Sequence, residues 1–176
     1  YQKELFEEYV MRNGDRVEDR RELKKLYEAG RPLTGPQGLR KQLAAFDLGY
    51  FGRAYLKHYF VRKSPEFHEE LDGIWTKGVL KSRSPYREAA EISRLDGSRS
   101  VVAAPRGHAK STNFTFKDSL HAALYRYKHY IIILSDSSDQ AEGFLTDIKT
   151  EMEDNADIRE DFGRQQGKVW KSNVIL

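Results

Sequence analysis

The segment APRGHAKST, at residues 104–112, is the strongest indication of a fold class in this sequence. It follows a short apolar run at residues 101–103, within a strand predicted at residues 100–103, and it precedes a helical pattern. A loop between a strand and a helix is a common place to bind phosphate, because its backbone N–H groups and the helix N-terminus both attract an anion. The position of the segment therefore indicates a phosphate-binding loop.

The residues of this loop match the pattern GxxxxGK[ST] at its most diagnostic end. Lys110 and Ser111 occupy the last two positions, whereas Ala104 and Ala109 stand in place of the usual glycines. A lysine at this place binds the β- and γ-phosphates of a nucleotide, and the hydroxyl binds Mg²⁺. We therefore expect ATP and Mg²⁺ as cofactors. Because alanine restricts positive φ, Gly107 is expected to be the flexible point of the loop.

The nucleotide is expected to contact the loop from its proline to its threonine. The expected binding residues are Pro105, Arg106, Gly107, His108, Ala109, Lys110, Ser111 and Thr112. Arg106 and Lys110 are the expected catalytic residues, because both are cations beside the phosphates, and Ser111 is the expected Mg²⁺ ligand. The alternative is an ordinary turn with Lys110 in solvent, but a cation in the first turn opposes the helix dipole unless an anion is present.

The chain after the loop predicts a βαβ unit. A helical pattern at residues 111–127 is followed by YIIIL at residues 130–134, which is too short and too β-branched for a helix and predicts a buried strand. Another amphipathic helix follows and is expected to end at Asn155, and residues 169–176 predict a further strand. We therefore expect an α/β fold, a P-loop NTPase core of the ASCE type with parallel strands and flanking helices. This core is expected over residues 98–176 and to be incomplete at its C-terminal end.

Residues 1–97 predict a helical region ahead of that core. Apolar residues recur at helical spacing over residues 2–29, with a break at Asn13 and Gly14. They recur again over residues 39–61, where Gly49 and Gly52 are expected to interrupt the helix. The second of these stretches is rich in aromatic residues. Such rings can stack on nucleic-acid bases, but at helical spacing core packing is the more common role, and we expect it here.

Composition narrows the class of protein. The chain of 176 residues has no cysteine, which excludes disulfides and cysteine-based zinc sites and is most compatible with a reducing, intracellular setting. No apolar stretch is long enough to span a membrane, so we expect a soluble protein. Lys and Arg number 30 against 27 Asp and Glu, for a net charge of +3. This excess does not by itself require a nucleic-acid partner, although the basic residues are concentrated in the first two thirds of the chain.

Hydrolysis of ATP requires an acidic pair in addition to the loop, typically an apolar strand ending in Asp followed by Glu. Asp136 is the candidate in this sequence, but it is followed by Ser137 rather than Glu. We interpret the SDSSD segment at residues 135–139 as the start of the next helix, with Asp139 as its cap. The acidic pair is expected to lie beyond residue 176, in a longer protein.

Three segments together resemble the ATPase region of the large terminase subunits of tailed bacteriophages. They are PRGHAKST after its apolar run, YIIILSDSSDQAEGFLTDIKTEMEDN at residues 130–155, and the later tryptophan of KVWKSNVIL. The upstream segments FGRAYLKHYF and SPEFHEEL are similar to the helical lead-in of that family. The resemblance covers residues 39–176 and is strongest over residues 100–162.

The resemblance implies an ATP-driven motor that moves double-stranded DNA into a procapsid. It implies a homo-oligomeric ring at the portal, in the host cytoplasm, with the portal protein and the small terminase subunit as partners and a nuclease domain elsewhere in the protein. By position, Lys110 and Ser111 would hold the phosphates and Mg²⁺, and Arg106 would stabilise the γ-phosphate. Two alternatives remain: another P-loop DNA translocase or helicase, and a non-catalytic module for nucleotide binding or assembly.

Overall fold

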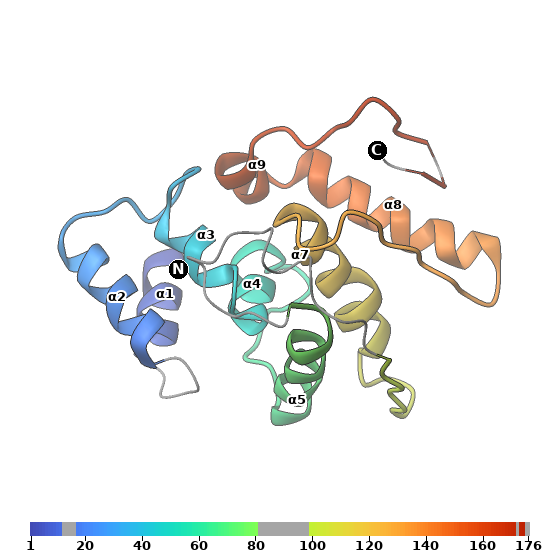
Figure 1. Ribbon diagram of the computed structural model, residues 1–176, viewed down its shortest axis with the longest axis horizontal. Helices are drawn as coiled ribbons and strands as arrows, with labels where there is room; N and C mark the ends of the chain where they lie inside the picture. The colour runs from blue at the N-terminus through green and yellow to red at the C-terminus, as the bar shows by residue number, and fades with distance from the viewer. Residues whose placement is uncertain (12–16, 81–98, 172, 175–176) are drawn as a thin grey trace.

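Helices make up the regular structure of this chain. The computed structural model describes residues 1–11, 17–80, 99–171 and 173–174 (Figure 1). Apart from an isolated bridge at Trp170, these residues contain no strand and no sheet. The predicted α/β P-loop core with parallel strands is therefore wrong for the described part of the chain.

The predicted strands fail because their backbones have no neighbour to pair with. Residues 100–103 and 130–134 run without regular structure, and Val101 and Leu134 are 98% and 88% exposed. A strand is stable only when another strand pairs with it and its side chains pack on a face, and neither condition can be read from local periodicity. In the third predicted strand, residues 175–176 lie outside the described residues.

The first two helices are α1 (Gln2–Val10) and α2 (Val17–Glu28), as the sequence predicts. The apolar stripe of α1 is buried, and its Phe6 ring lies 5.3 Å from the ring of Tyr27 in a tilted contact. The expected break at Asn13 and Gly14 lies between these helices, in residues 12–16, which are outside the described part.

The aromatic stretch forms α3 (Leu39–Ala44) and α4 (Leu48–Tyr55). α4 begins at Asp47, whose carboxylate accepts a hydrogen bond of 2.8 Å from the Tyr50 backbone N–H. Gly49 and Gly52 lie inside α4, although the sequence predicts that they interrupt a helix. Gly52 is required by close packing, because a Cβ there would lie 3.2 Å from the Lys117 side chain.

The expectation that the aromatic stripe is core is confirmed for five of its six members. Those five are Phe46, Tyr50, Phe51, Tyr55 and Phe60, whereas Tyr59 is 48% exposed. Their rings contact one another and the following helices; Phe51 and Tyr55, for example, lie 5.2 Å apart. These rings are therefore occupied in packing.

Helix α5 (Glu66–Trp75) follows, with Pro65 at its N-cap. It continues as the π-helical turn η1 (Thr76–Leu80). The predicted boundary between residues 97 and 98 lies outside the described residues. The division into two domains therefore stays a prediction.

A continuous helical run extends from residue 110 to residue 124 and contains the π-helical segment η2 (Thr112–Asp118) and α7 (Ser119–Leu124). Helices α8 (Ser138–Asp154) and α9 (Ala156–Phe162) complete the described elements.

The caps of α8 and α9 are side chains of neighbouring residues. Ser137, not the expected Asp139, caps α8 by accepting from the Gln140 backbone N–H, which supports the interpretation of SDSSD as a helix start. Asn155 ends α8, as predicted, and caps α9 by accepting from the Ile158 backbone N–H.

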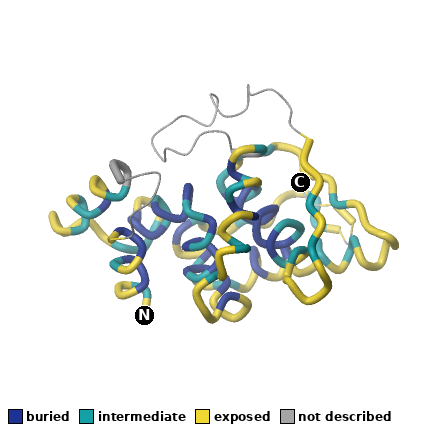
Figure 2. The backbone as a smooth tube through the Cα atoms, turned by 90° about the horizontal axis from the view of Figure 1, so that it is seen from below, coloured by how far each residue is buried: buried dark blue, intermediate teal, exposed yellow. Residues whose placement is uncertain are grey.

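One hydrophobic core joins the early and late helices. Figure 2 shows buried positions gathered in the helices and exposed positions in the connecting segments. The core includes residues from α1, α3, α4, η2, α7, α8 and α9, among them Leu5, Phe6, Leu39, Leu43, Tyr50, Phe51, Phe116, Leu120, Ile148, Met152 and Ile158.

A buried arginine ties the early helices to the last one. Arg40 on α3 is 1% exposed and contacts Asp157, Glu160 and Asp161 of α9. The shortest of these ion pairs, from Arg40 Nε to Asp161 Oδ2, measures 2.6 Å. The Tyr55 hydroxyl donates to the same Asp161 oxygen. The three carboxylates compensate the buried charge of Arg40, as burial requires.

Candidate functional site

The loop at residues 104–112 turns through two residues with left-handed backbone. Gly107 has φ of 83°, as its expected role as the flexible point requires, and Ala109 has φ of 51°. Alanine adopts this region at a cost, because its Cβ approaches the following carbonyl. Ala109 thus takes a conformation that suits the glycine usual at this position of the pattern, although the sequence led us to expect restriction there.

The helix that starts at Lys110 presents an open N-terminus. The Asn113 backbone N–H donates to the Ala109 carbonyl at 2.9 Å, which is the first hydrogen bond of the helix. By helix geometry, the N–H groups of Lys110, Ser111 and Thr112 precede that bond and have no acceptor within the helix. Ala109 has no side-chain oxygen with which to cap them. The first turn can therefore donate to an anion.

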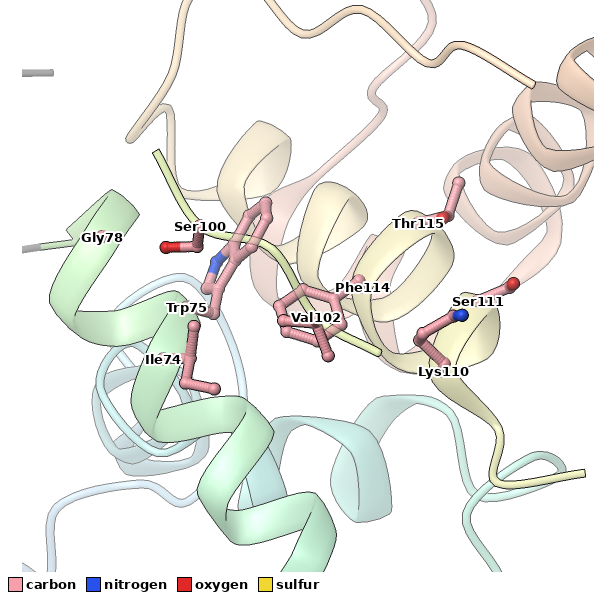
Figure 3. Close-up of a pocket in the computed structure, with 9 residues that line it drawn as sticks. All are labelled: Ile74, Trp75, Gly78, Ser100, Val102, Lys110, Ser111, Phe114 and Thr115. Carbon is pink, nitrogen blue, oxygen red and sulfur yellow. The ribbon is translucent and has the colours of Figure 1, made fainter. Parts of the chain in front are cut away.

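Lys110 and Ser111 line a cavity of about 350 Å³. They lie together at the start of the helix, while Ile74 and Trp75 approach from the end of α5 on the other side (Figure 3). Lys110 is half-buried and Ser111 is exposed, so both are accessible to a ligand. The structure therefore brings the two most diagnostic residues of the loop to one hollow.

Other members of the predicted site lie around the loop. Arg106 is exposed at the turn itself, and Pro105 is exposed just before it. His108 is held against α5: its ring lies edge-on to Phe67 with 5.8 Å between centroids, and its carbonyl accepts from His68 Nε2 at 3.1 Å. Contacts between His108 and the first turn of α5 therefore hold the loop in position.

The helix that follows the loop, at residues 110–124 and called the loop helix below, carries a group of buried charges that was not anticipated from the sequence. Lys117 is 1% exposed, is paired with Asp72 of α5, and lies 3.4 Å from Asp118 Oδ1. Burial raises the pKa of Asp118 to about 7, although Lys117 opposes that shift. The sequence signal was present: the FKDSLHAAL segment places charged residues among the apolar positions of one helix.

His121, one turn further along this helix, is also fully buried. Burial lowers the pKa of His121 to about 3, so the ring is neutral at ordinary pH, and its Nε2 donates to the Ala44 carbonyl at 2.9 Å. Together with Lys117, it ties the loop helix to α3, α4 and α5.

The site contains no preformed metal centre within the described residues. No group of three or more His, Asp or Glu side chains is placed to hold a metal ion in that part of the chain. Ser111, the expected Mg²⁺ ligand, offers a single hydroxyl, which is compatible with Mg²⁺ that keeps several waters and binds nucleotide phosphates. Asp136 is exposed in the segment before α8.

Comparison with protein-family models, with curated proteins and with solved structures gave no match. None of the described helices is long and apolar enough to cross a membrane.

Proposed function

We propose that the loop at residues 104–112 binds the phosphates of Mg-ATP in a viral DNA-packaging motor. The observation that supports the proposal is the loop geometry: two left-handed residues, Gly107 and Ala109, lead into an uncapped helix N-terminus with Lys110 and Ser111 at its first positions. An anion at this place would accept from the open N–H groups and offset the charge of Lys110, which otherwise opposes the helix dipole.

Each cation and hydroxyl has a distinct role in this proposal. Lys110 binds the β- and γ-phosphates, and Ser111 contributes a ligand to Mg²⁺. Arg106, exposed at the turn, stabilises charge on the γ-phosphate. Hydrogen bonds to charged groups contribute roughly 1.5–3 kcal/mol each, so these side chains account for much of the affinity.

Hydrolysis and DNA movement rest on the terminase resemblance. In that proposal the longer protein hydrolyses ATP to drive double-stranded DNA into a procapsid. It works as a homo-oligomeric ring at the portal, with the portal protein and small terminase subunit as partners, in the host cytoplasm. Another DNA translocase or helicase would use the loop in the same way.

A module that binds nucleotide without hydrolysing it is a second candidate. The helical packing of the described residues favours it, because hydrolysing loops of this pattern are built on a sheet whose neighbouring strands supply the acidic residues. The two candidates share the phosphate site and differ in turnover.

The variant Lys110→Ala tests the shared site, with Lys3→Ala on the exposed face of α1 as the matched control. Titration calorimetry with Mg-ATP is expected to give affinity about 10- to 100-fold weaker for Lys110→Ala, because a charged hydrogen bond is lost. The control is expected to bind as the wild type does. Equal affinity of all three proteins would contradict the proposal.

Turnover in the full-length protein separates the two candidates. For a motor, Lys110→Ala abolishes ATPase activity, and Arg106→Ala slows hydrolysis while largely retaining nucleotide binding. Nucleotide binding by a full-length wild type that shows no turnover would favour the non-catalytic module.

A further inference from the structure

The cavity beside Lys110 and Ser111 has an apolar half that phosphate binding does not use. Its walls there are the rings of Trp75 and Phe114 and the side chains of Ile74 and Val102. Figure 3 shows Trp75 across the hollow from Lys110, with Val102 and Phe114 between them. A ligand that fills the cavity would thus have one charged end and one flat, apolar end.

Trp75 carries an unmet hydrogen-bonding group at this apolar end. Its indole Nε1 is buried and has no hydrogen-bond partner among the described residues. A tryptophan N–H usually finds an acceptor when it is buried, since the lost hydration is otherwise not replaced. Because almost none of this N–H is accessible, a ligand in the cavity would contact the apolar ring of the indole and not its N–H.

The size of the cavity also suits a nucleoside. Its volume of about 350 Å³ lies within the range typical of pockets for small organic ligands. The Trp75 and Phe114 rings stand 64° apart with centroids at 6.1 Å, so they form a corner rather than two parallel faces. A base would therefore rest in this corner against the rings instead of being inserted between them.

From these features we infer that the cavity takes the purine base of the nucleotide whose phosphates lie at Lys110 and Ser111. The inference rests on the proposed function and adds the place at which the base binds. A bicyclic purine covers more of the apolar wall than a pyrimidine does. Phosphate affinity and base affinity then come from opposite ends of one cavity.

Tryptophan fluorescence tests this directly, because the chain has two tryptophans, Trp75 and Trp170. In the Trp170→Phe variant, Trp75 is the only tryptophan. Mg-ATP and Mg-GTP are expected to change its emission with saturation, whereas inorganic tripolyphosphate binds without a comparable change. The matched control is Trp75→Phe, in which the remaining Trp170 is expected not to respond. A saturable response to tripolyphosphate as large as that to ATP would overturn the inference.

Affinities measured by calorimetry give a second, independent test. Trp75→Phe retains an aromatic ring but a smaller one, so its affinity for Mg-ATP is expected to fall about 3- to 10-fold with tripolyphosphate binding unchanged. Unchanged tripolyphosphate binding also shows that the variant is folded. Mg-CTP is expected to bind more weakly than Mg-ATP to the wild type.

The outcomes distinguish the base site from the phosphate site. If tripolyphosphate, Mg-CTP and Mg-ATP bind equally and Trp75→Phe changes nothing, the base site is refuted and the phosphate site stands. If neither ATP nor tripolyphosphate binds the wild type, both are refuted. Loss of ATP binding in Lys110→Ala together with a Trp75 response in the wild type supports both.

Discussion

Two leucines illustrate how differently the helical core and the extended segments treat apolar residues. Leu43 on α3 is fully buried, whereas Leu134, in the apolar run at residues 130–134, is 88% exposed. Both belong to strongly apolar patterns, and both were expected to be buried. The difference is that α3 has helices α2 and α4 packed against it, while the run at residues 130–134 has no strand beside it. Apolar character thus led to burial only where a partner surface was supplied.

The charged residues of the core and of the loop also differ in their surroundings. Arg40 is buried in the core, where three carboxylates surround it. Arg106 is exposed at the loop, and Lys110 is half-buried beside a cavity. Cations of the core therefore hold helices together, whereas those of the loop remain accessible for a ligand.

The largest expected effect is on the core ion cluster. Arg40→Ala leaves the buried Asp161 carboxylate without its cation, and is expected to lower the free energy of unfolding by about 3–5 kcal/mol. Lys24→Ala, which removes a surface pair with Glu28 at 3.8 Å, is expected to cost less than about 1 kcal/mol. Urea unfolding followed by circular dichroism measures both. Similar losses in the two variants would show that burial does not set the value of the Arg40 cluster.

The same substitution in the two regions gives the most direct comparison. Leu43→Ala is expected to cost about 2–5 kcal/mol, because it leaves a cavity in the core. Leu134→Ala is expected to stay within about 0.5 kcal/mol of the wild type, because the side chain is already in water. Urea unfolding of the pair checks this. A large loss for Leu134→Ala would mean that residues 130–134 are covered in solution.

The buried Asp118 makes a prediction about pH. Because burial raises its pKa to about 7, the folded protein binds more protons at this group than the unfolded protein does between about pH 4 and pH 7. Its contribution to stability is complete below pH 4 and is lost as pH rises through 7. Burial lowers the pKa of His121 from 6.5 to about 3. The contribution of His121 to stability is therefore complete above pH 6.5 and is lost as pH falls towards 3.

Asp118→Asn isolates the first of these contributions. Relative to the wild type, the variant is expected to gain stability as pH rises from 4 to 8, on the order of 1 kcal/mol for each pKa unit of the shift. Unfolding at several pH values measures the difference. A constant difference for Asp118→Asn would contradict the raised pKa.

The smallest expected effects concern the backbone of the loop. Gly107→Ala places a Cβ at φ of 83°, and is expected to cost about 1 kcal/mol although nothing lies within 4 Å of that Cβ. Ala109→Gly relieves the same kind of strain at φ of 51° but increases the freedom of the unfolded chain, so its net gain is expected to be below about 1 kcal/mol. Thermal unfolding of the two variants should move in opposite directions.

Much of the helical structure could be predicted because its determinants are close together along the chain. The apolar stripes of α1 and α8 and the Asn155 stop between α8 and α9 are set by residues within a few positions of each other. The core role of the aromatic stripe followed from the same periodicity. Break positions were less accurate: the structure interrupts this stretch at residues 45–47 and keeps Gly49 and Gly52 inside α4.

For the candidate site, sequence reasoning identified the loop and its position before a helix but not its surroundings. Lys110 and Ser111 were marked by the pattern alone. Trp75 was not connected with them, because it lies 35 positions earlier and only folding brings it to the same cavity. The ion pair between Lys117 and Asp72 was not predicted for the same reason, because its two residues are distant along the chain.

By itself, the sequence determined where the helices form, which of their faces are apolar, and that a cationic loop precedes a helix N-terminus. These features depend on local spacing, on caps and on helix geometry. Only the tertiary structure decided that the apolar runs at residues 100–103 and 130–134 do not pair into a sheet, and that α3, α4 and α9 share a core with the loop helix. Strand pairing and shared burial require partners that are distant in sequence, so the pattern of one segment cannot specify them.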